Sequence, residues 1–273
     1  MTVVVVQGVS LWGPGLPGWT EARSVLCGQD DYVVTDVPLP PSSLLAANER
    51  RRAGLATRLA LFVAQQASES AGVTPGSIPS AFATSNGDGA VVDTILQAIA
   101  AHEPISPTQF HNSVHNTAAG YWSIATGSRQ PTTCFAGHDG TAAAALLKAA
   151  AEVHAERRPL LLCVYDVPLP APLDVKHPTE GAVGVGLVLA PDGASAGMAR
   201  IDVRYTGCPA GDADWLPRLS TLHRLAAGNP AARLLRLLES LASHVPDAFS
   251  LALLDGQVKV RLEPCSPGGT SLS

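Results

Sequence analysis

Segments typical of buried strands alternate with segments typical of helices along most of this chain. Residues 2–14 begin with a continuous β-branched run, and 80–85 and 160–167 are further short apolar runs. Between them, apolar residues recur at helical spacing over 49–71 and 89–102. Strands that alternate with helices form parallel sheets covered by helices. The sequence therefore predicts a layered α/β fold with a mixed, mostly parallel sheet.

A short strand, a tight bend and a long Ala-rich helix follow one another over residues 131–153, PTTCFAGHDGTAAAALLKAAAEV. A reactive group at such a bend gains from the helix dipole and from free backbone N–H groups, which stabilise negative charge. This chain presents Asp139 there. An aspartate just before a helix usually accepts those N–H bonds as a cap. The residue itself therefore indicates a structural role before a chemical one.

The pattern changes in the last third of the chain. Residues 166–180 contain four prolines and predict a long surface loop, and 103–110 predict a shorter one. After a strand at 181–190, an amphipathic helix is predicted over 229–245. Two alternating strands joined at Asp255-Gly256 then predict a hairpin. We divide the chain into a domain over 1–206 and a small α+β appendix over 207–273.

Composition limits the classes of partner. Only 15% of the residues are charged and the net charge is −5, which offers no basic surface for nucleic acid. The five cysteines stand singly, without the paired spacing of a zinc site or a disulfide framework. The first residues carry no basic leader, and the small-apolar run at 142–151 is interrupted by Lys148. We expect a cytoplasmic protein with reduced cysteines, no membrane span and no metal or cofactor.

Residues 105–149 and 179–190 resemble the β-ketoacyl synthase family, the thiolase-fold condensing enzymes of fatty-acid and polyketide synthesis. The first segment, ISPTQFHNSVHNTAAGYWSIATGSRQPTTCFAGHDGTAAAALLKA, is similar to the family's run of proline loop, Asn with small residues, helix, turn, strand, nucleophile and helix. The second, TEGAVGVGLVLA, is similar to the strand that closes the family's first half. The resemblance covers roughly residues 1–206 and implies a thiolase-like fold.

The resemblance places the family's nucleophilic cysteine at Asp139 and its neighbours at Gly140 and Thr141. The family also needs two histidines and a lysine from its second half, which activate decarboxylation and hold an enolate oxygen. After residue 207 this chain has only His223 and His244, and neither lies in a Gly/Thr-rich loop. The resemblance therefore implies a thiolase-like half that has lost its catalytic residues.

Some condensing enzymes pair with an inactive homologue that closes the acyl tunnel and sets product length. This chain resembles such a chain-length-factor-type subunit, of the short kind found beside aryl-polyene or xanthomonadin-type pigment synthases. The implied partners are a full-length β-ketoacyl synthase and, through the complex, an acyl carrier protein; a homodimer is the other possible pairing. The tunnel and interface candidates are a loop, a pair of large aromatics suited to contact centres and the strand before the bend: Phe110, His111, Val114, Tyr121, Trp122, Thr132, Thr133, Cys134 and Phe135.

Two rival hypotheses come from the residues themselves. In one, the chain is an acyltransferase or hydrolase that uses Cys134, although a thiol inside a strand is usually inert. In a variant of the same hypothesis, a cluster of His111, His115, His138 and Asp139 forms a hydrolytic or metal site. His111 and His115 are four residues apart, as two ligands on one helical face would be, but no H-E-x-x-H pattern supports the site. In the other, the chain is a homodimeric scaffold without any pocket.

Overall fold

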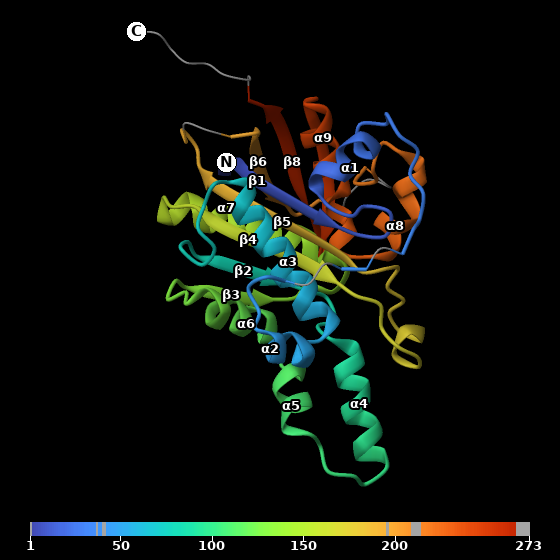
Figure 1. Cartoon of the computed structure of the whole chain (residues 1–273). Helices are drawn as coiled ribbons and strands as arrows, with labels where there is room; N and C mark the ends of the chain where they lie inside the picture. The colour runs from blue at the N-terminus through green and yellow to red at the C-terminus, as the bar shows by residue number, and fades with distance from the viewer. Residues whose placement is uncertain (1, 37, 40–41, 195–196, 209–213, 266–273) are drawn as a thin grey trace.

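An eight-stranded sheet runs through the whole molecule in the computed structural model, which describes residues 2–36, 38–39, 42–194, 197–208 and 214–265. The strand order is β3-β2-β4-β5-β1-β6-β8-β7 (Figure 1). The strands are β1 (Thr2–Trp12), β2 (Ser80–Ala83), β3 (Thr132–Phe135), β4 (Leu160–Asp166), β5 (Val183–Pro191), β6 (Ala199–Thr206), β7 (Asp247–Leu253) and β8 (Gly256–Pro264).

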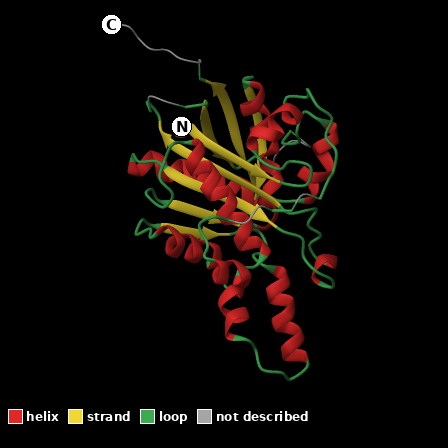
Figure 2. Cartoon of the chain, viewed as in Figure 1, coloured by secondary structure: helices red, strands yellow, loops and turns green. Residues whose placement is uncertain are grey.

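Helices cover both faces of this sheet, as Figure 2 shows. They are α1 (Trp19–Leu26), α2 (Ala47–Arg52), α3 (Leu55–Ser70), α4 (Gly89–Ala100), α5 (Pro107–Ser113), α6 (Thr117–Thr126), α7 (Thr141–Glu156), α8 (His223–Gly228) and α9 (Leu235–Ser243), with 3-10 turns η1 (His138–Gly140), η2 (Leu173–Val175), η3 (Ser220–Leu222) and η4 (Ala231–Leu234). One core lies between the sheet and α1, α7, α8 and α9, and a second lies between the sheet and α3 and α6. The β4 residues alternate between the two cores, so the predicted layered α/β fold is confirmed.

The sheet is mixed, but the prediction that it is mostly parallel was wrong. Strand β2 is parallel to β3 and to β4, whereas the other five described pairings are antiparallel. Parallel neighbours need a crossover, usually a helix, that carries the chain back to the end of the sheet where the first strand began. The loop between β4 and β5 contains only the short η2, so β5 begins beside the end of β4 and runs antiparallel to it.

The helix predicted over 49–71 is divided into α2 and α3 at Ala53 and Gly54, where the backbone is extended. A Cβ at Gly54 would lie 1.9 Å from Asp88 Oδ2, so this carboxylate approaches the break closely and leaves no room for a side chain at position 54. The loop predicted over 103–110 was wrong in its second part, because α5 begins at Pro107. Proline is favoured in the first turn of a helix, where its missing N–H has no partner to lose.

The strands after residue 206 continue the same sheet. Strand β8 pairs with β6 over its whole length, and β7 pairs with β8 as the predicted hairpin, with Leu254 and Asp255 in the turn. The predicted helix over 229–245 is present as η4 followed by α9. The boundary at 206 stays a prediction. Among the described residues, no helix is long and apolar enough to cross a membrane.

Candidate functional site

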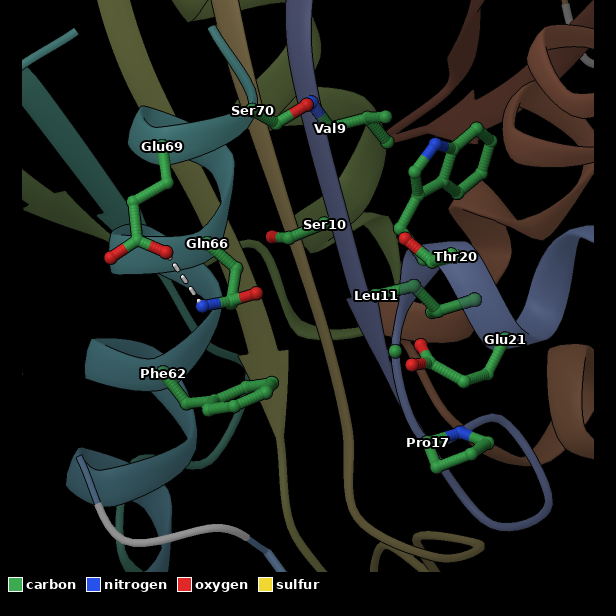
Figure 3. Close-up of a pocket in the computed structure, with 12 residues that line it drawn as sticks. Val9, Ser10, Leu11, Pro17, Thr20, Glu21, Phe62, Gln66, Glu69 and Ser70 are labelled. Carbon is green, nitrogen blue, oxygen red and sulfur yellow. Dashed lines mark hydrogen bonds between the residues drawn. The ribbon is translucent and has the colours of Figure 1, made fainter. Parts of the chain in front are cut away.

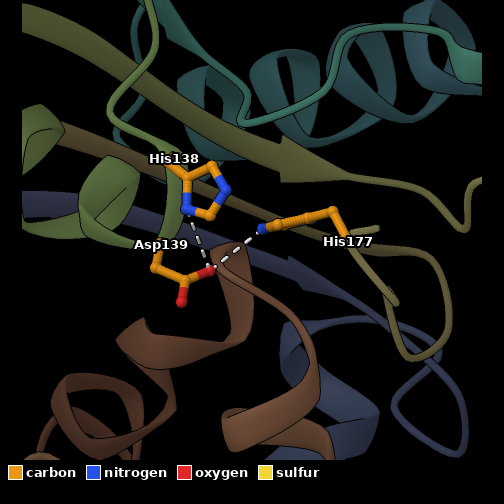
Figure 4. A group of neighbouring side chains, drawn as sticks. All are labelled: His138, Asp139 and His177. Carbon is orange, nitrogen blue, oxygen red and sulfur yellow. Dashed lines mark hydrogen bonds and ion pairs between the residues drawn. The ribbon is translucent and has the colours of Figure 1, made fainter. Parts of the chain in front are cut away.

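Position 139 lies at the junction that the sequence predicted, between the end of β3 and the start of α7 (Figure 4). Asp139 is the middle residue of η1, and His138 before it has a left-handed backbone with φ of 50°. Histidine adopts this region more readily than most residues. The expectation that Asp139 caps the helix was wrong. Gly140 is the cap residue, and it makes no side-chain hydrogen bond to the first N–H groups of α7.

The Asp139 carboxylate instead points away from the helix and meets three basic side chains. His177 Nε2 lies 3.0 Å from Oδ1, and His138 Nδ1 lies 3.6 Å from the same oxygen (Figure 4). Arg233 Nη2 lies 3.3 Å from Oδ2, and Arg233 Nη1 donates to the backbone oxygen of Asp139. The carboxylate therefore serves as the acceptor at the centre of a small charged cluster.

The topology explains why these residues meet. The parallel strands β2, β3 and β4 have their carboxyl ends side by side, and α/β proteins place their sites at such strand ends. Asn86 follows β2, His138 and Asp139 follow β3, and His177 lies in the loop after β4. Asn86 Nδ2 lies 3.1 Å from His177 Nδ1 and donates to Thr179 Oγ1. The three strand ends are thereby joined by side-chain hydrogen bonds.

These contacts keep Asp139 ionised. Partial burial raises the pKa of the carboxyl, but the charge of Arg233, the hydrogen bond from His177 and the two imidazoles outweigh it, so the pKa of Asp139 is lower than usual. Because the carboxylate accepts from His177 Nε2, that nitrogen carries the proton and Nδ1 is free to accept from Asn86. An ionised, bonded carboxylate cannot serve as a proton donor at neutral pH.

A second carboxylate belongs to the hydrogen-bond network around the junction. Asp166, at the end of β4, is fully buried, and its Oδ1 accepts from Thr84 Oγ1 and from both the N–H and Oγ of Ser85. Burial raises the pKa of Asp166, partly offset by these hydrogen bonds. Asn229 Nδ2 donates to the backbone oxygens of residues 180 and 181, which ties the loop after β4 to the start of η4. This network positions the loop that carries His177.

The structure does not assemble the cluster predicted from His111, His115, His138 and Asp139. Among the described residues, the group of potential metal ligands is His138, Asp139 and His177. His115 Nε2 lies 3.4 Å from the backbone oxygen of Thr84, and the His111 ring packs against Tyr121. Helical spacing brought the two histidines of 111–115 into one hypothesis, but α5 ends at Ser113 between them.

Sequence reasoning missed His177 and Arg233. His177 lies in the proline-rich loop that was interpreted as a surface excursion, and Arg233 lies in the predicted amphipathic helix. The order of the elements did contain a signal for His177, because a loop that follows β4 must start at the carboxyl ends of the parallel strands, where Asp139 lies. No comparable signal identified Arg233, whose guanidinium stacks over Trp215 at 5.1 Å from the ring centre.

Cys134 lies in β3, half-buried, and burial raises its pKa. β3 is an edge strand, so one side of its backbone has no described strand partner. On this strand Thr133 is exposed and accepts from Lys148 Nζ, while Thr132 and Phe135 are half-buried. A raised pKa keeps the Cys134 thiol protonated, which is the unreactive form.

Of the remaining tunnel and interface candidates, two are exposed and two are buried. Phe110 and Val114 are 62% and 43% exposed, in and directly after α5, and α4 and α5 extend away from the sheet (Figure 1). Trp122 is buried against Phe82 in the core, so the expectation that it lies at an interface was wrong; its side of α6 faces the sheet. Tyr121 is also buried.

Two cavities complete this description. A pocket of about 300 Å³ is lined by Leu44, Leu45, Ala46, Glu49, His111, Tyr121, Ile124 and Ala125. A larger groove of about 460 Å³ lies between β1, α3 and the start of α1 (Figure 3). Glu21 stands on one of its walls and Gln66, bonded to Glu69, on the other. No residue proposed from the sequence lines this groove.

Comparison with known proteins adds a family model and a set of solved structures. The model described as "Beta-ketoacyl synthase, N-terminal domain" matches residues 27–234, more than half of the chain. A search of curated proteins finds no match.

Three solved structures are similar to this chain in fold. A structure of the ketosynthase ApeO in complex with its chain length factor ApeC, from Xenorhabdus doucetiae, matches with a TM-score of 0.72 and 17% identity, over 96% of this chain and 100% of the other. The ishigamide ketosynthase/chain length factor matches with a TM-score of 0.70 and 16% identity, over 97% and 100%. A β-ketoacyl synthase from Burkholderia phymatum matches with a TM-score of 0.67 and 12% identity, over 97% and 100%.

Proposed function

Because the chain belongs to the β-ketoacyl synthase family through its N-terminal domain, we propose that it is a non-catalytic subunit of a condensing enzyme. In this proposal it forms a heterodimer with a full-length β-ketoacyl synthase and acts as a chain length factor. The complex would receive acyl groups from an acyl carrier protein, in fatty-acid or polyketide-type synthesis such as that of aryl polyenes. The partner would supply the nucleophile and both catalytic histidines.

The observation that carries the proposal is the side chain at the strand-to-helix junction. Relatives that condense acyl groups have a cysteine there, by the resemblance described above, and this chain has Asp139. Its carboxylate is fixed by Arg233 and His177 and stays ionised. A carboxylate bonded on both oxygens is a poor nucleophile, and the nearest thiol in sequence, Cys134, has a raised pKa.

The surface beside the junction supports a protein partner. The free edge of β3 offers backbone groups for pairing with another strand. Next to it, Ile124 on α6 is 80% exposed, and Phe110 on α5 is 62% exposed. Helix α4 is rich in apolar residues, yet Gly89 is its only buried residue. Exposed apolar residues that gather on one side of a soluble protein mark a contact surface.

Similar structures support the kind of partner. Two of them are titled as ketosynthases with their chain length factors, and a third is titled as a type II polyketide ketosynthase in complex with its acyl-carrier protein, at 11% identity and a TM-score of 0.73. The alignments cover nearly all of both chains, so the matched subunits are about as long as this one. At this identity the similarity concerns fold, and the partner assignment is our proposal.

Co-purification of paired exposed-residue variants tests the interface. Ile124→Glu places a charge on the proposed contact surface, and we expect it to abolish co-purification with the tagged full-length β-ketoacyl synthase of the same organism. Val33→Glu is the matched control, because Val33 is 63% exposed in the loop after α1, which is bonded to the chain just after β1, four strands from β3 in the sheet. We expect this variant to co-purify like the unchanged protein.

Size-exclusion chromatography with light scattering gives the mass of each complex. A heterodimer with the unchanged chain and with Val33→Glu, but not with Ile124→Glu, supports the proposal. If the unchanged chain elutes alone beside every synthase of its organism, or if Ile124→Glu binds as well as Val33→Glu, the proposed interface is wrong.

A further inference from the structure

We propose that His138, Asp139 and His177 form a binding site for one Zn²⁺ ion at the junction of β3 and α7. The site goes beyond the subunit role and does not depend on it. It also revises the expectation from sequence that the chain holds no metal. The rival metal hypothesis used a cluster containing His111 and His115, and the structure replaces both with His177.

The donor atoms already converge. One potential ligand atom from each of His138, Asp139 and His177 lies within 4.8 Å of those of the other two. Around a tetrahedral zinc ion with bonds of about 2.0 to 2.1 Å, neighbouring ligand atoms are about 3.3 Å apart. Two separations bracket this value, namely 3.0 Å from Oδ1 to His177 and 3.6 Å from Oδ1 to His138. The His138 side chain is 73% exposed, so its ring has room to rotate toward the other two ligands.

Neighbouring groups hold two of the three ligands in place. The His177 side chain is only 14% exposed, and its Nδ1 contacts the amide of Asn86 at 3.1 Å. Arg233 binds Oδ2 of Asp139 and the backbone oxygen of the same residue, which leaves Oδ1 directed at the imidazoles. Metal-binding histidines and carboxylates usually have such partners on their other atoms. The Asn86 and Arg233 contacts therefore fit a site in which orientation is fixed before the ion binds.

The donor chemistry selects the class of ion. Two imidazole nitrogens and one carboxylate oxygen suit Zn²⁺ and the neighbouring transition metals better than Mg²⁺ or Ca²⁺, which prefer oxygen ligands. Three protein ligands leave a fourth position, on the exposed side of His138, for water or an external ligand. When the ion binds Nε2, the single proton of the neutral His177 ring moves from Nε2 to Nδ1 by exchange with solvent, and the Asn86 amide turns so that its oxygen accepts from Nδ1.

The charge of Arg233 sets a limit on affinity. Its guanidinium lies 3.3 Å from Asp139 Oδ2 and repels a bound cation. A site of this kind binds more weakly than a structural zinc site with thiolate ligands. The bound ion would link the bend after β3 to the loop after β4, two segments that otherwise meet through hydrogen bonds and ion pairs among side chains.

Metal titration of the full chain, purified without a histidine tag, tests the site. We expect one Zn²⁺ per chain by calorimetry and a saturable visible spectrum with Co²⁺ as the spectroscopic probe. His177→Ala and the isosteric Asp139→Asn should each weaken Zn²⁺ binding by at least about tenfold. His154→Ala, which removes an exposed histidine at the end of α7, should leave the affinity unchanged.

Circular dichroism of each variant separates loss of the site from loss of the fold, and Asp139→Asn decides the matter if His177→Ala does not fold. A Co²⁺ spectrum that fails to saturate near one ion per chain would overturn the proposal. Equal affinities for His177→Ala, Asp139→Asn and His154→Ala would overturn it as well, because they would indicate binding to surface histidines in general.

Discussion

At the scale of single residues, Asp139 is held by charge rather than by packing. Its carboxylate is more than half exposed, yet Arg233 and His177 fix both oxygens. The same strand-to-helix geometry that would lower the pKa of a cysteine thiol here serves an aspartate that is already ionised. The junction thus keeps a site for negative charge, and it has no sulfur at position 139.

Alkylation of Cys134 tests the reactivity that remains at this scale. Because burial raises the pKa of the Cys134 thiol, we expect iodoacetamide at neutral pH to modify it at least about tenfold more slowly than the exposed Cys208. Peptide mass spectrometry over a time course measures both rates in the same sample. Modification of Cys134 faster than Cys208 would contradict this account and favour an enzyme that uses this thiol.

At the scale of elements, the second domain predicted from sequence is joined to the main sheet by more than strand pairing. Asp247 at the start of β7 accepts from Arg236 Nε and Nη2 at 2.6 and 3.0 Å and from Ser240 Oγ at 2.8 Å. Arg218 lies 3.1 Å from the same carboxylate. The Asp247 side chain is only 7% exposed, so α9 is fixed against the hairpin by a largely buried ion pair.

The Asp247 cluster predicts a stability that depends on pH. Burial of this carboxyl raises its pKa. The hydrogen bonds from Arg236 and Ser240 and the two arginine charges outweigh burial, and the pKa of Asp247 is lowered to about 2. The unfolded value is about 3.9, so the stabilisation is complete above about pH 4 and is lost as the pH falls through 2. We expect Asp247→Asn to lower the free energy of unfolding by roughly 2 kcal/mol at pH 7.

Urea unfolding between pH 7 and pH 3 measures this effect. The difference between Asp247→Asn and the unchanged protein should shrink below pH 4. Asp192→Asn is the control, because the Asp192–Arg200 pair has similar geometry but lies exposed on the surface, where such pairs contribute little. A difference for Asp247→Asn that is the same at both pH values, or no larger than that for Asp192→Asn, would contradict the argument.

Local features of this fold could be predicted from sequence, and long-range ones could not. The apolar runs of β1 and β4 and the turn before Gly256 identify elements that depend on neighbours in the chain. The close approach of Asp88 to the break at Gly54 joins two segments far apart in the chain, and no periodicity contains that contact. Strand order is equally non-local, which is why the antiparallel pairings of β1 were missed.

The same distinction between local and long-range features applies to the candidate site. The position of Asp139 follows from its own strand, bend and helix, which the sequence displays as one segment. Its partners do not, because His177 and Arg233 reach it from 38 and 94 residues away. Spacing along one helix, the signal that suggested His111 and His115, carries no information about which loops meet at a sheet edge.

At the scale of the whole molecule, the described strands form one eight-stranded sheet, which includes the last two strands of the chain. The free edge of β3 and the apolar surfaces of α4, α5 and α6 lie at one end of the sheet, and the hairpin of β7 and β8 closes the other end. Such a molecule has a surface suited to a partner and lacks a thiol at the junction. Its proposed role depends on the chemistry of the other subunit.

Intact-protein mass spectrometry of the complex, after incubation with an acyl-loaded carrier protein, tests this role most directly. The account predicts that the mass of the acyl group is added to the full-length synthase and that this chain keeps its unmodified mass. An acyl adduct on this chain, formed in the complex or with the chain alone, would contradict the assignment as a non-catalytic subunit.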